Sequence, residues 1–135
     1  MVTTDIQFAD VAQAVEEGFL KTPKRLPSWL FYDETGDKIF QAIMRMPEYY
    51  LTACEYEILQ MQKEKLLKHF SPSHAPFNLI ELGAGNGLKT EILLRHFMER
   101  KTDFVYSPID VSESVLAQLS KRLDNILPEL VVEPI

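Results

Sequence analysis

The spacing of hydrophobic residues changes once along the chain, near Phe70. Before that point, apolar residues recur every three or four positions, which is the period of a helix packed on one side. Val11, Val15 and Phe19 follow this spacing, so the pattern predicts an amphipathic helix within the first twenty residues. This helix is expected to end before Pro23, which cannot continue it.

Two more helices are predicted in the first half of the chain. Residues 33–36 (DETG) form a turn-like run, and a short helix is expected from about residue 37 to residue 46. Thr52 and Glu55 have the spacing of a capping box, in which a hydroxyl and a carboxylate satisfy free N–H groups at a helix start. A helix over residues 53–69 is therefore expected.

The second half of the chain alternates between strand and helix patterns. The predicted strands cover residues 77–82, 104–109 and 130–132, and the predicted helices cover residues 89–99 and the segment that Ser112 caps. The short apolar run 77–82 is typical of a buried parallel strand. Alternating elements imply a parallel sheet with right-handed crossovers. The predicted fold class is α/β, an incomplete Rossmann-like sheet (residues 71–135) preceded by a helical segment (residues 1–70).

Composition narrows the class of protein further. The chain has 135 residues, of which 46% are hydrophobic and 25% are charged, as in one soluble globular domain. The net charge of −6 disfavours binding to nucleic acid or anionic lipid and favours a small-molecule or protein partner. No apolar run reaches the ~18 residues of a membrane span. The single cysteine, Cys54, excludes an internal disulfide, so a reducing, cytoplasmic setting is expected.

Neither the cysteine nor the histidines predict a reactive or metal-binding centre. No base is fixed beside Cys54 in the sequence, so Cys54 is expected to be a small buried apolar residue rather than a nucleophile. The three histidines lack the spacing of metal ligands, and no metal is predicted.

The segment from Glu81 to Gly87 (ELGAGNG) carries the strongest chemical signal. Glycines there allow positive φ and remove Cβ atoms, so the backbone can turn sharply and touch a ligand at the strand's carboxyl end. A dinucleotide-binding loop would need glycine at Leu88, and the Glu81 carboxylate would oppose a pyrophosphate. We therefore predict a cationic or neutral nucleotide-type ligand at Glu81, Gly83, Gly85 and Gly87. The structural alternative is a tight turn.

Asp110, at the end of the second predicted strand, is the other part of the signal. An acidic residue at this place accepts hydrogen bonds from ribose hydroxyls. Its alternative role is to cap the helix that follows. Because the carboxyl ends of neighbouring parallel strands share one edge, the glycine segment and Asp110 together favour an adenosyl ligand.

Three segments carry a family resemblance: LPSWLFYDETGDKIFQAIMRMPEYYLTACEYEIL (26–59), IELGAGNGLKT (80–90) and PIDVSESVL (108–116). They resemble class I S-adenosylmethionine-dependent methyltransferases, and more closely the family that contains the histidine N-alpha-methyltransferase of ergothioneine biosynthesis. The glycine segment indicates only the broad class, and the helical prelude with MPEYY narrows it. The resemblance implies methylation of the α-amine of a histidine-like amino acid, with S-adenosyl-L-methionine as the cofactor.

The resemblance also implies roles for single residues. Gly83 would contact the methionyl part of the cofactor, Lys89 its carboxylate and Asp110 its ribose. Tyr49 would line the amino-acid pocket, and Tyr32 is a second candidate for it. The structural alternatives are a solvent-exposed lysine and packed aromatic rings with hydroxyl groups at the surface. No residue is assigned as a catalytic base.

The chain departs from the family pattern after the paired tyrosines. Leu51, Ala53 and Cys54 stand where the family usually has proline, arginine and threonine. This departure weakens the implied assignment of histidine as the substrate.

Length is the second departure. A class I methyltransferase sheet has seven strands and three are predicted here, so we expect an N-terminal fragment that binds cofactor weakly and is inactive alone. Strand 77–82, central in the usual order, would then be an open apolar edge, which predicts a homodimer or higher assembly. The alternative functions are a Rossmann-type dehydrogenase and a non-catalytic nucleotide-binding or protein-interaction module.

Overall fold

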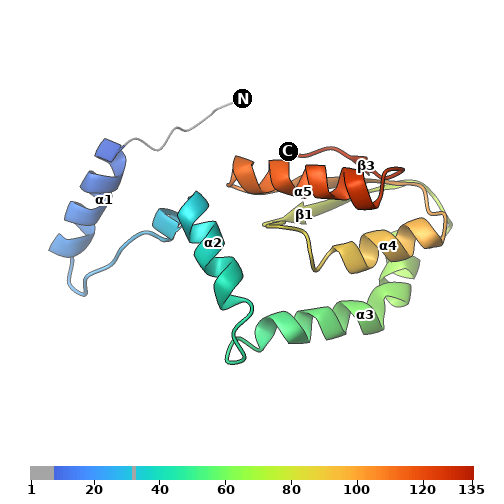
Figure 1. The fold of residues 1–135 in the computed structure, drawn as a ribbon, viewed down its shortest axis with the longest axis horizontal. Coiled ribbons are helices and arrows are strands. Elements are labelled where there is room, and N and C mark those ends of the chain that lie inside the picture. The colour runs from blue at the N-terminus through green and yellow to red at the C-terminus, as the bar shows by residue number, and fades with distance from the viewer. Residues whose placement is uncertain (1–7, 32) are drawn as a thin grey trace.

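The computed structural model describes residues 8–31 and 33–135, with five α-helices beside a small sheet (Figure 1). The helices are α1 (Phe8–Leu20), α2 (Glu34–Ile43), α3 (Leu51–Phe70), α4 (Glu91–Glu99) and α5 (Glu113–Ile126), with a 3-10 turn, η1 (Ser28–Phe31). The strands are β1 (Phe77–Leu82), β2 (Phe104–Ile109) and β3 (Val131–Val132). None of the helices within these residues has the length and apolar character needed to cross a membrane.

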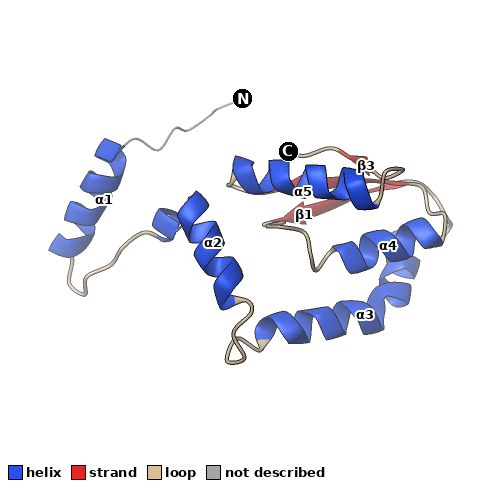
Figure 2. Ribbon diagram, viewed as in Figure 1, coloured by secondary structure: helices blue, strands red, loops and turns tan. Residues whose placement is uncertain are grey.

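The three strands form one parallel sheet in the order β1-β2-β3. Phe77 pairs with Phe104 and Leu82 pairs with Ile109, so β1 and β2 run in register over their whole length. The helices α4 and α5 connect successive strands (Figure 2). The predicted α/β class and parallel sheet are therefore confirmed, and both carboxyl strand ends lie at one edge of the sheet.

The hydrophobic core lies between the sheet and the connecting helices. Phe104 and Tyr106 of β2 are buried with Phe97 of α4 and with Leu119 and Leu123 of α5. The ring of Phe97 meets the ring of Phe104 edge-on at 5.6 Å, a favoured aromatic geometry. This packing fixes the two long strands and α5 beneath the segment that carries the glycines.

The opposite face of the sheet is open at its two outer strands, β1 and β3, in the part of the chain that the structure describes. Successive side chains of a strand point to opposite faces, and the alternate residues of β1 are exposed. Ile80 is 57% exposed, Leu82 is 81% exposed and Val131 of β3 is 52% exposed. The prediction of a buried strand at 77–82 is therefore wrong for this face, because the described helices that pack on the core leave it uncovered.

Three helix starts differ from the sequence-based expectation, and that of α4 is Glu91 rather than residue 89. α2 begins at Glu34 rather than at residue 37, because Asp33 caps it by accepting a hydrogen bond from Gly36 N at 2.6 Å. The capping box predicted for α3 is wrong, since this helix begins at Leu51 and no side chain caps it. The carboxylate of Glu55 contacts Lys89 instead.

Cys54 lies on an exposed part of α3, so the expectation that it is buried is also wrong. This result follows from the place of α3, which contributes partly buried residues such as Leu59 and Leu66 to the core and no fully buried ones. The residues of α3 on other sides of the helix, Cys54 among them, therefore face solvent.

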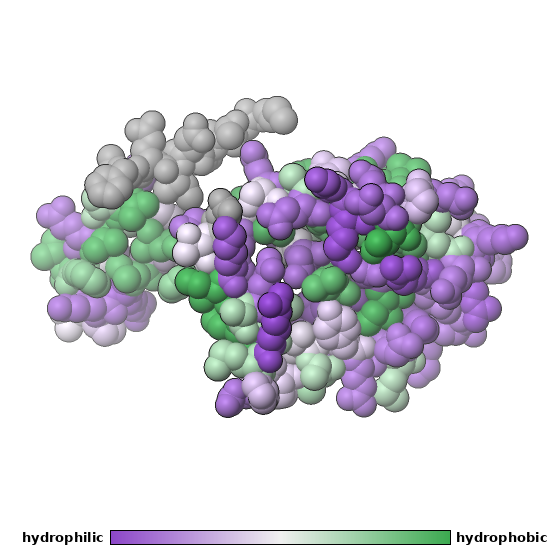
Figure 3. All heavy atoms as spheres, viewed as in Figure 1, coloured by the Kyte–Doolittle hydropathy of each residue, from purple (hydrophilic) through white to green (hydrophobic). Residues whose placement is uncertain are grey.

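α1 lies at the far end of the molecule from the sheet, and α2 lies between α1 and the start of α5 (Figure 1). Hydrophobic side chains remain at the surface around α1, as the green spheres show in Figure 3. Phe19 and Leu20 of this helix are 53% and 79% exposed. Of these two helices, α2 is the one that lies beside the start of α5.

Candidate functional site

The glycine segment and Asp110 meet at the carboxyl edge of the sheet. Gly85 N donates a hydrogen bond to Asp110 Oδ2 at 2.8 Å, and Ser112 N donates to Asp110 Oδ1 at 3.0 Å. Gly83 N donates to the carbonyl of Ile109 at 2.8 Å, which ties the bend to the end of β2. The structure therefore brings together the two elements that the sequence singled out.

The glycines of the bend have different surroundings. Gly83, Gly85 and Gly87 all have positive φ, at 68°, 54° and 64°. A Cβ added at Gly83 or Gly85 would meet no atom within 4 Å, whereas one added at Gly87 would lie 2.2 Å from Leu119 Cδ1. Gly83 and Gly85 thus border open space, while Gly87 allows α5 to pack closely against the bend.

Glu81 lies half-buried below the bend, with both carboxylate oxygens bound within the protein. Thr90 Oγ1 donates to Glu81 Oε1 and Tyr106 OH donates to Glu81 Oε2, each at 2.5 Å. Burial raises the pKa of the Tyr106 phenol far above its ordinary value, and the Glu81 carboxylate raises it further. Glu81 therefore joins β1 to β2 and to the start of α4.

Lys89 follows the bend and precedes α4. Its Nζ atom lies 2.7 Å from Glu55 Oε2 on α3, and the Lys89 and Glu55 side chains are 36% and 51% exposed. A hollow of about 300 Å³ adjoins this pair, with Glu81, Leu79 and Leu93 among its lining residues. Lys89 is thus a partly exposed cation at the rim of a mostly apolar hollow, and Glu55 of α3 holds it there.

Arg122 of α5 is a site residue that the sequence analysis missed. Its guanidinium donates to the carbonyl of Asn86 in the bend at 3.0 Å and to the carboxylate of Glu91 on α4, which also binds Arg95. Burial raises the pKa of Glu91, but the hydrogen bonds and charges of the two arginines outweigh it and hold this pKa below its ordinary value. No local motif signals these contacts, because they join residues 31 and 36 positions apart.

The helical segment meets the site through α2. Ser112 Oγ donates to Asp37 Oδ2 of α2 at 2.8 Å. The ring of Tyr49 packs edge-on against Phe40 of the same helix, with 6.1 Å between ring centroids. Tyr49 is therefore linked to the strand ends through α2, while Tyr32 lies outside the described residues.

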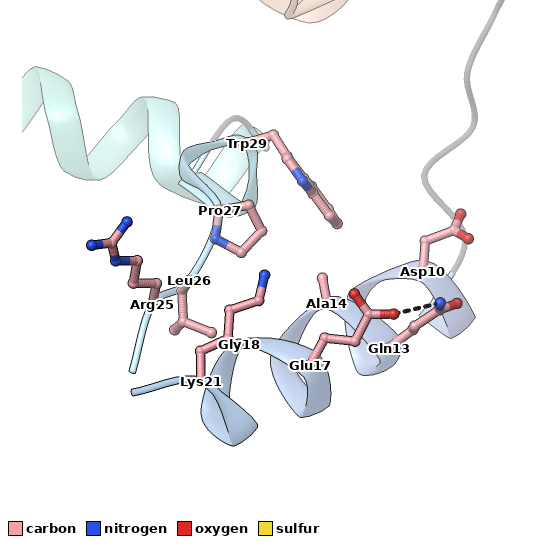
Figure 4. A pocket seen from close by; sticks show the side chains of 10 residues that line it. All are labelled: Asp10, Gln13, Ala14, Glu17, Gly18, Lys21, Arg25, Leu26, Pro27 and Trp29. Carbon is pink, nitrogen blue, oxygen red and sulfur yellow. Dashed lines mark hydrogen bonds between the residues drawn. The ribbon is translucent and has the colours of Figure 1, made fainter. Parts of the chain in front are cut away.

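A second hollow, of about 540 Å³, lies beside α1 (Figure 4), which is at the end of the molecule away from the sheet (Figure 1). Trp29 and Pro27 line one side of it, and Asp10 and Glu17 line the other. Glu17 accepts a hydrogen bond from Gln13 at 2.8 Å. This hollow contains none of the residues that meet at the strand ends.

Residues 11–135 match the sequence model of the family described as "Histidine-specific methyltransferase, SAM-dependent". The chain belongs to this family. It is 41% identical to the histidine N-alpha-methyltransferase of Mycobacterium tuberculosis over 82% of its length, which is 33% of that protein. It is 28% identical to the 4-dimethylallyltryptophan N-methyltransferase easF of Claviceps purpurea, over 84% of this chain and 32% of that protein.

The fold comparison agrees with the membership of this methyltransferase family. The CMeT domain of the citrinin polyketide synthase superposes on 79% of this chain and 28% of its own, with a TM-score of 0.55 at 21% identity. The fold is therefore that of a class I SAM methyltransferase, and S-adenosylmethionine is the methyl donor of the family. The chain spans about a third of the length of the two N-methyltransferase relatives named above.

Proposed function

We propose that this chain forms the cofactor-binding part of an N-methyltransferase that acts on the α-amine of an amino acid of the histidine type. The observation that carries the proposal is the hydrogen bond from Gly85 N to Asp110 Oδ2 at 2.8 Å. It holds a bend with open space above Gly83 and Gly85 against an acidic residue at the next strand end. The names of the relatives support amine methylation, of histidine in one and of 4-dimethylallyltryptophan in another.

The residues at the strand ends fit an adenosyl ligand. An ionised carboxylate has about four acceptor positions, and the two hydrogen bonds to Asp110 leave acceptor capacity on both of its oxygens. Asp110 would accept from the ribose hydroxyls, and the side-chain-free backbone at Gly83 and Gly85 would allow the ligand to approach closely. Glu81 and Gly87 would support the site without contacting the ligand, since Glu81 binds Thr90 and Gly87 packs against Leu119.

Lys89 would bind the donor's carboxylate by exchanging partners. Its present partner, Glu55, is half-exposed, and an exposed ion pair is worth only about 0–1 kcal/mol. A ligand carboxylate can therefore displace Glu55 at little cost. Tyr49 would line the amino-acid side of the site through its position beside α2, and Tyr32 is proposed for the same side from the sequence alone.

When bound, S-adenosylmethionine supplies an electrophilic methyl group on a sulfonium. The chain's residues would hold the donor at Asp110 and Lys89, while the substrate side orients a neutral amine towards the methyl carbon. Alignment of two bound reactants removes much of the entropic cost of a bimolecular step. Membership of the family does not favour the alternative of a non-catalytic interaction module.

Isothermal titration with S-adenosylhomocysteine tests the cofactor site. We expect binding to the native chain, and a loss of at least about ten-fold in affinity for Asp110→Ala, since hydrogen bonds to a charged group contribute about 1.5–3 kcal/mol. Asp124→Ala, at an exposed position of α5, is the matched control and should bind as the native chain does. Binding of NAD in place of S-adenosylhomocysteine, or equal affinity in both variants, would contradict the proposal.

We also propose that these 135 residues alone bind the donor weakly and transfer no methyl group. The chain covers only a third of the bacterial relative, and the site is open on the side of Gly83 and Gly85. Transfer of a labelled methyl group to histidine by the purified chain would refute this statement. The acceptor itself would be identified by comparing histidine with other amino acids in a chain extended to the length of these relatives.

We also propose that the protein self-associates and that it is cytoplasmic. Self-association through the β1 edge and the open sheet face would cover exposed Ile80 and Leu82. The exposed thiol of Cys54 is compatible with a reducing, cytoplasmic compartment.

A further inference from the structure

The hydroxyl group of Ser112 links α2 to the segment that follows β2. Ser112 is 9% exposed, and its Oγ donates to Asp37 Oδ2 at 2.8 Å across 75 positions of the sequence. The same oxygen accepts from Val115 N at 3.4 Å and so caps α5. Asp37 therefore contacts the N-terminal end of α5, where the helix dipole favours a negative charge.

The contact continues from Ser112 to the bend. Ser112 N donates to Asp110 Oδ1 at 3.0 Å, and the other oxygen of Asp110 accepts from Gly85 N at 2.8 Å. Hydrogen bonds to a carboxylate are shorter and about twice as strong as neutral ones. Three such bonds thus link α2 to the backbone of the glycine segment.

α2 also contacts Tyr49, which the family resemblance assigns to the amino-acid side of the site. Phe40 follows Asp37 by three positions, so both side chains lie on one side of the helix. Phe40 packs edge-on against Tyr49, at 80° between the ring planes. One helix thus contacts Tyr49 directly and reaches Asp110, at the strand end, through Ser112.

We propose that α2 couples the amino-acid side of the site to the cofactor side, with Asp37 as a positioning residue that acts through Ser112 on Asp110. This inference rests on the proposed function. A ligand that restrains Asp110 also restrains Ser112, and so favours the position of α2 in which Asp37 accepts from Ser112. The effect is reciprocal, because a substrate that orders Tyr49 and α2 must favour the cofactor by the same factor.

Amide hydrogen exchange of the purified protein, with and without S-adenosylhomocysteine, tests the coupling. In the native protein the ligand should slow exchange both in residues 83–88 and in α2, the latter by about five-fold or more. In Asp37→Ala, the ligand should still slow exchange in residues 83–88, but it should no longer change the exchange rate of α2. Asp37→Asn keeps an acceptor oxygen and should restore part of the protection of α2, while Asp124→Ala, at an exposed position of α5, should match the native protein.

The possible results separate a failure of the coupling from a failure of the cofactor site. If the ligand protects α2 equally in Asp37→Ala and in the native protein, α2 is not coupled through Asp37. If the ligand protects residues 83–88 but not α2 in the native protein, the coupling is refuted while the cofactor site stands. If the ligand protects neither segment, the proposed function fails and the coupling fails with it. Should Asp37→Ala not fold, Asp37→Asn takes its place. Weaker or lost protection of α2, with residues 83–88 still protected, then supports coupling through Asp37, and protection of α2 equal to that of the native protein refutes it.

Discussion

At the scale of single residues, the glycines of the bend meet two different physical needs. Gly85 has positive φ and open space at its missing Cβ, whereas Gly87 has positive φ and Leu119 at that place. The sequence shows three equivalent glycines, and only the packing of α5 separates them. The open space at Gly85 is the room that the proposed ligand would need, whereas the absence of a side chain at Gly87 allows close packing of the protein on itself.

Substituting these two glycines by alanine should therefore give opposite results. Alanine in the left-handed region costs about 1–2 kcal/mol, and the overlap with Leu119 at position 87 should add about 1–3 kcal/mol. We expect Gly87→Ala to lower the free energy of unfolding more than Gly85→Ala, as measured in urea. Gly85→Ala should instead show the larger loss of S-adenosylhomocysteine affinity per unit of lost stability. A Gly85→Ala variant less stable than Gly87→Ala would contradict this assignment.

The pair of Tyr106 and Glu81 gives a second prediction, at alkaline pH. Burial, reinforced by the Glu81 carboxylate, raises the pKa of the Tyr106 phenol, so the folded protein holds this proton more tightly than the unfolded chain. The resulting stability is fully present below the ordinary tyrosine pKa of about 10 and is lost as the pH rises above it. Tyr106→Phe removes this dependence.

Urea unfolding of both proteins at about pH 8 and about pH 10.5 measures the effect. Tyr106→Phe should be about 1–3 kcal/mol less stable at the lower pH, because Glu81 loses a donor in a half-buried place. Its stability should then fall less steeply between the two values. Parallel declines would show that Tyr106 does not retain its proton preferentially in the folded state.

At the scale of elements, the sequence predicts strands better than helix starts. The bounds of β1 and β2 match the predicted runs 77–82 and 104–109, because each is an apolar run of 6 residues, which suits a strand and is too short for a typical helix. A helix start depends on which distant partner claims its polar residues. Glu55 has capping-box spacing, yet it pairs with Lys89, and nothing local in the sequence decides between these partners.

Arg122 and Glu91 are likewise partners that no local sequence pattern indicates. Their ion pair gives the third prediction. The two residues join α5 to α4, and Arg122 also holds the bend at Asn86. Although burial opposes it, the hydrogen bonds and charges of Arg122 and Arg95 lower the pKa of Glu91 in the folded protein. The stability that this carboxylate contributes is present above its ordinary pKa of about 4.3 and is lost as the pH falls through the lowered value.

Glu91→Gln should therefore lower the free energy of unfolding by about 1–3 kcal/mol near neutral pH and make it less sensitive to acid. Urea unfolding at about pH 7 and about pH 4 provides the measurement. Glu99→Gln, at the exposed end of the same helix, is the control and should retain the native pH dependence. An acid response of Glu91→Gln equal to that of the native protein would exclude a role for this ion pair in acid stability.

At the scale of the whole molecule, the sequence predicts which residues meet at the strand ends better than it predicts where the helical segment lies. The glycine segment and Asp110 end neighbouring parallel strands, so topology alone brings them to one edge. Asp37 and Tyr49 belong to a helical segment whose place against the sheet no sequence period encodes. The hydrogen bond between Asp37 and Ser112 spans 75 positions, and only the folded chain reveals that α2 reaches the site.

The open face of the sheet gives the last prediction. In the described part of the chain, β1 pairs with β2 alone, and its Leu82 side chain is 81% exposed. An uncovered strand edge beside exposed apolar side chains favours pairing with another chain. Sedimentation velocity should therefore show association that increases with protein concentration, and Leu82→Lys should shift the protein towards the monomer. Leu20→Lys on α1, where the native leucine is 79% exposed, should leave the association unchanged. Dissociation by Leu20→Lys alone would place the contact on α1, and a native protein that is strictly monomeric would refute self-association at either surface.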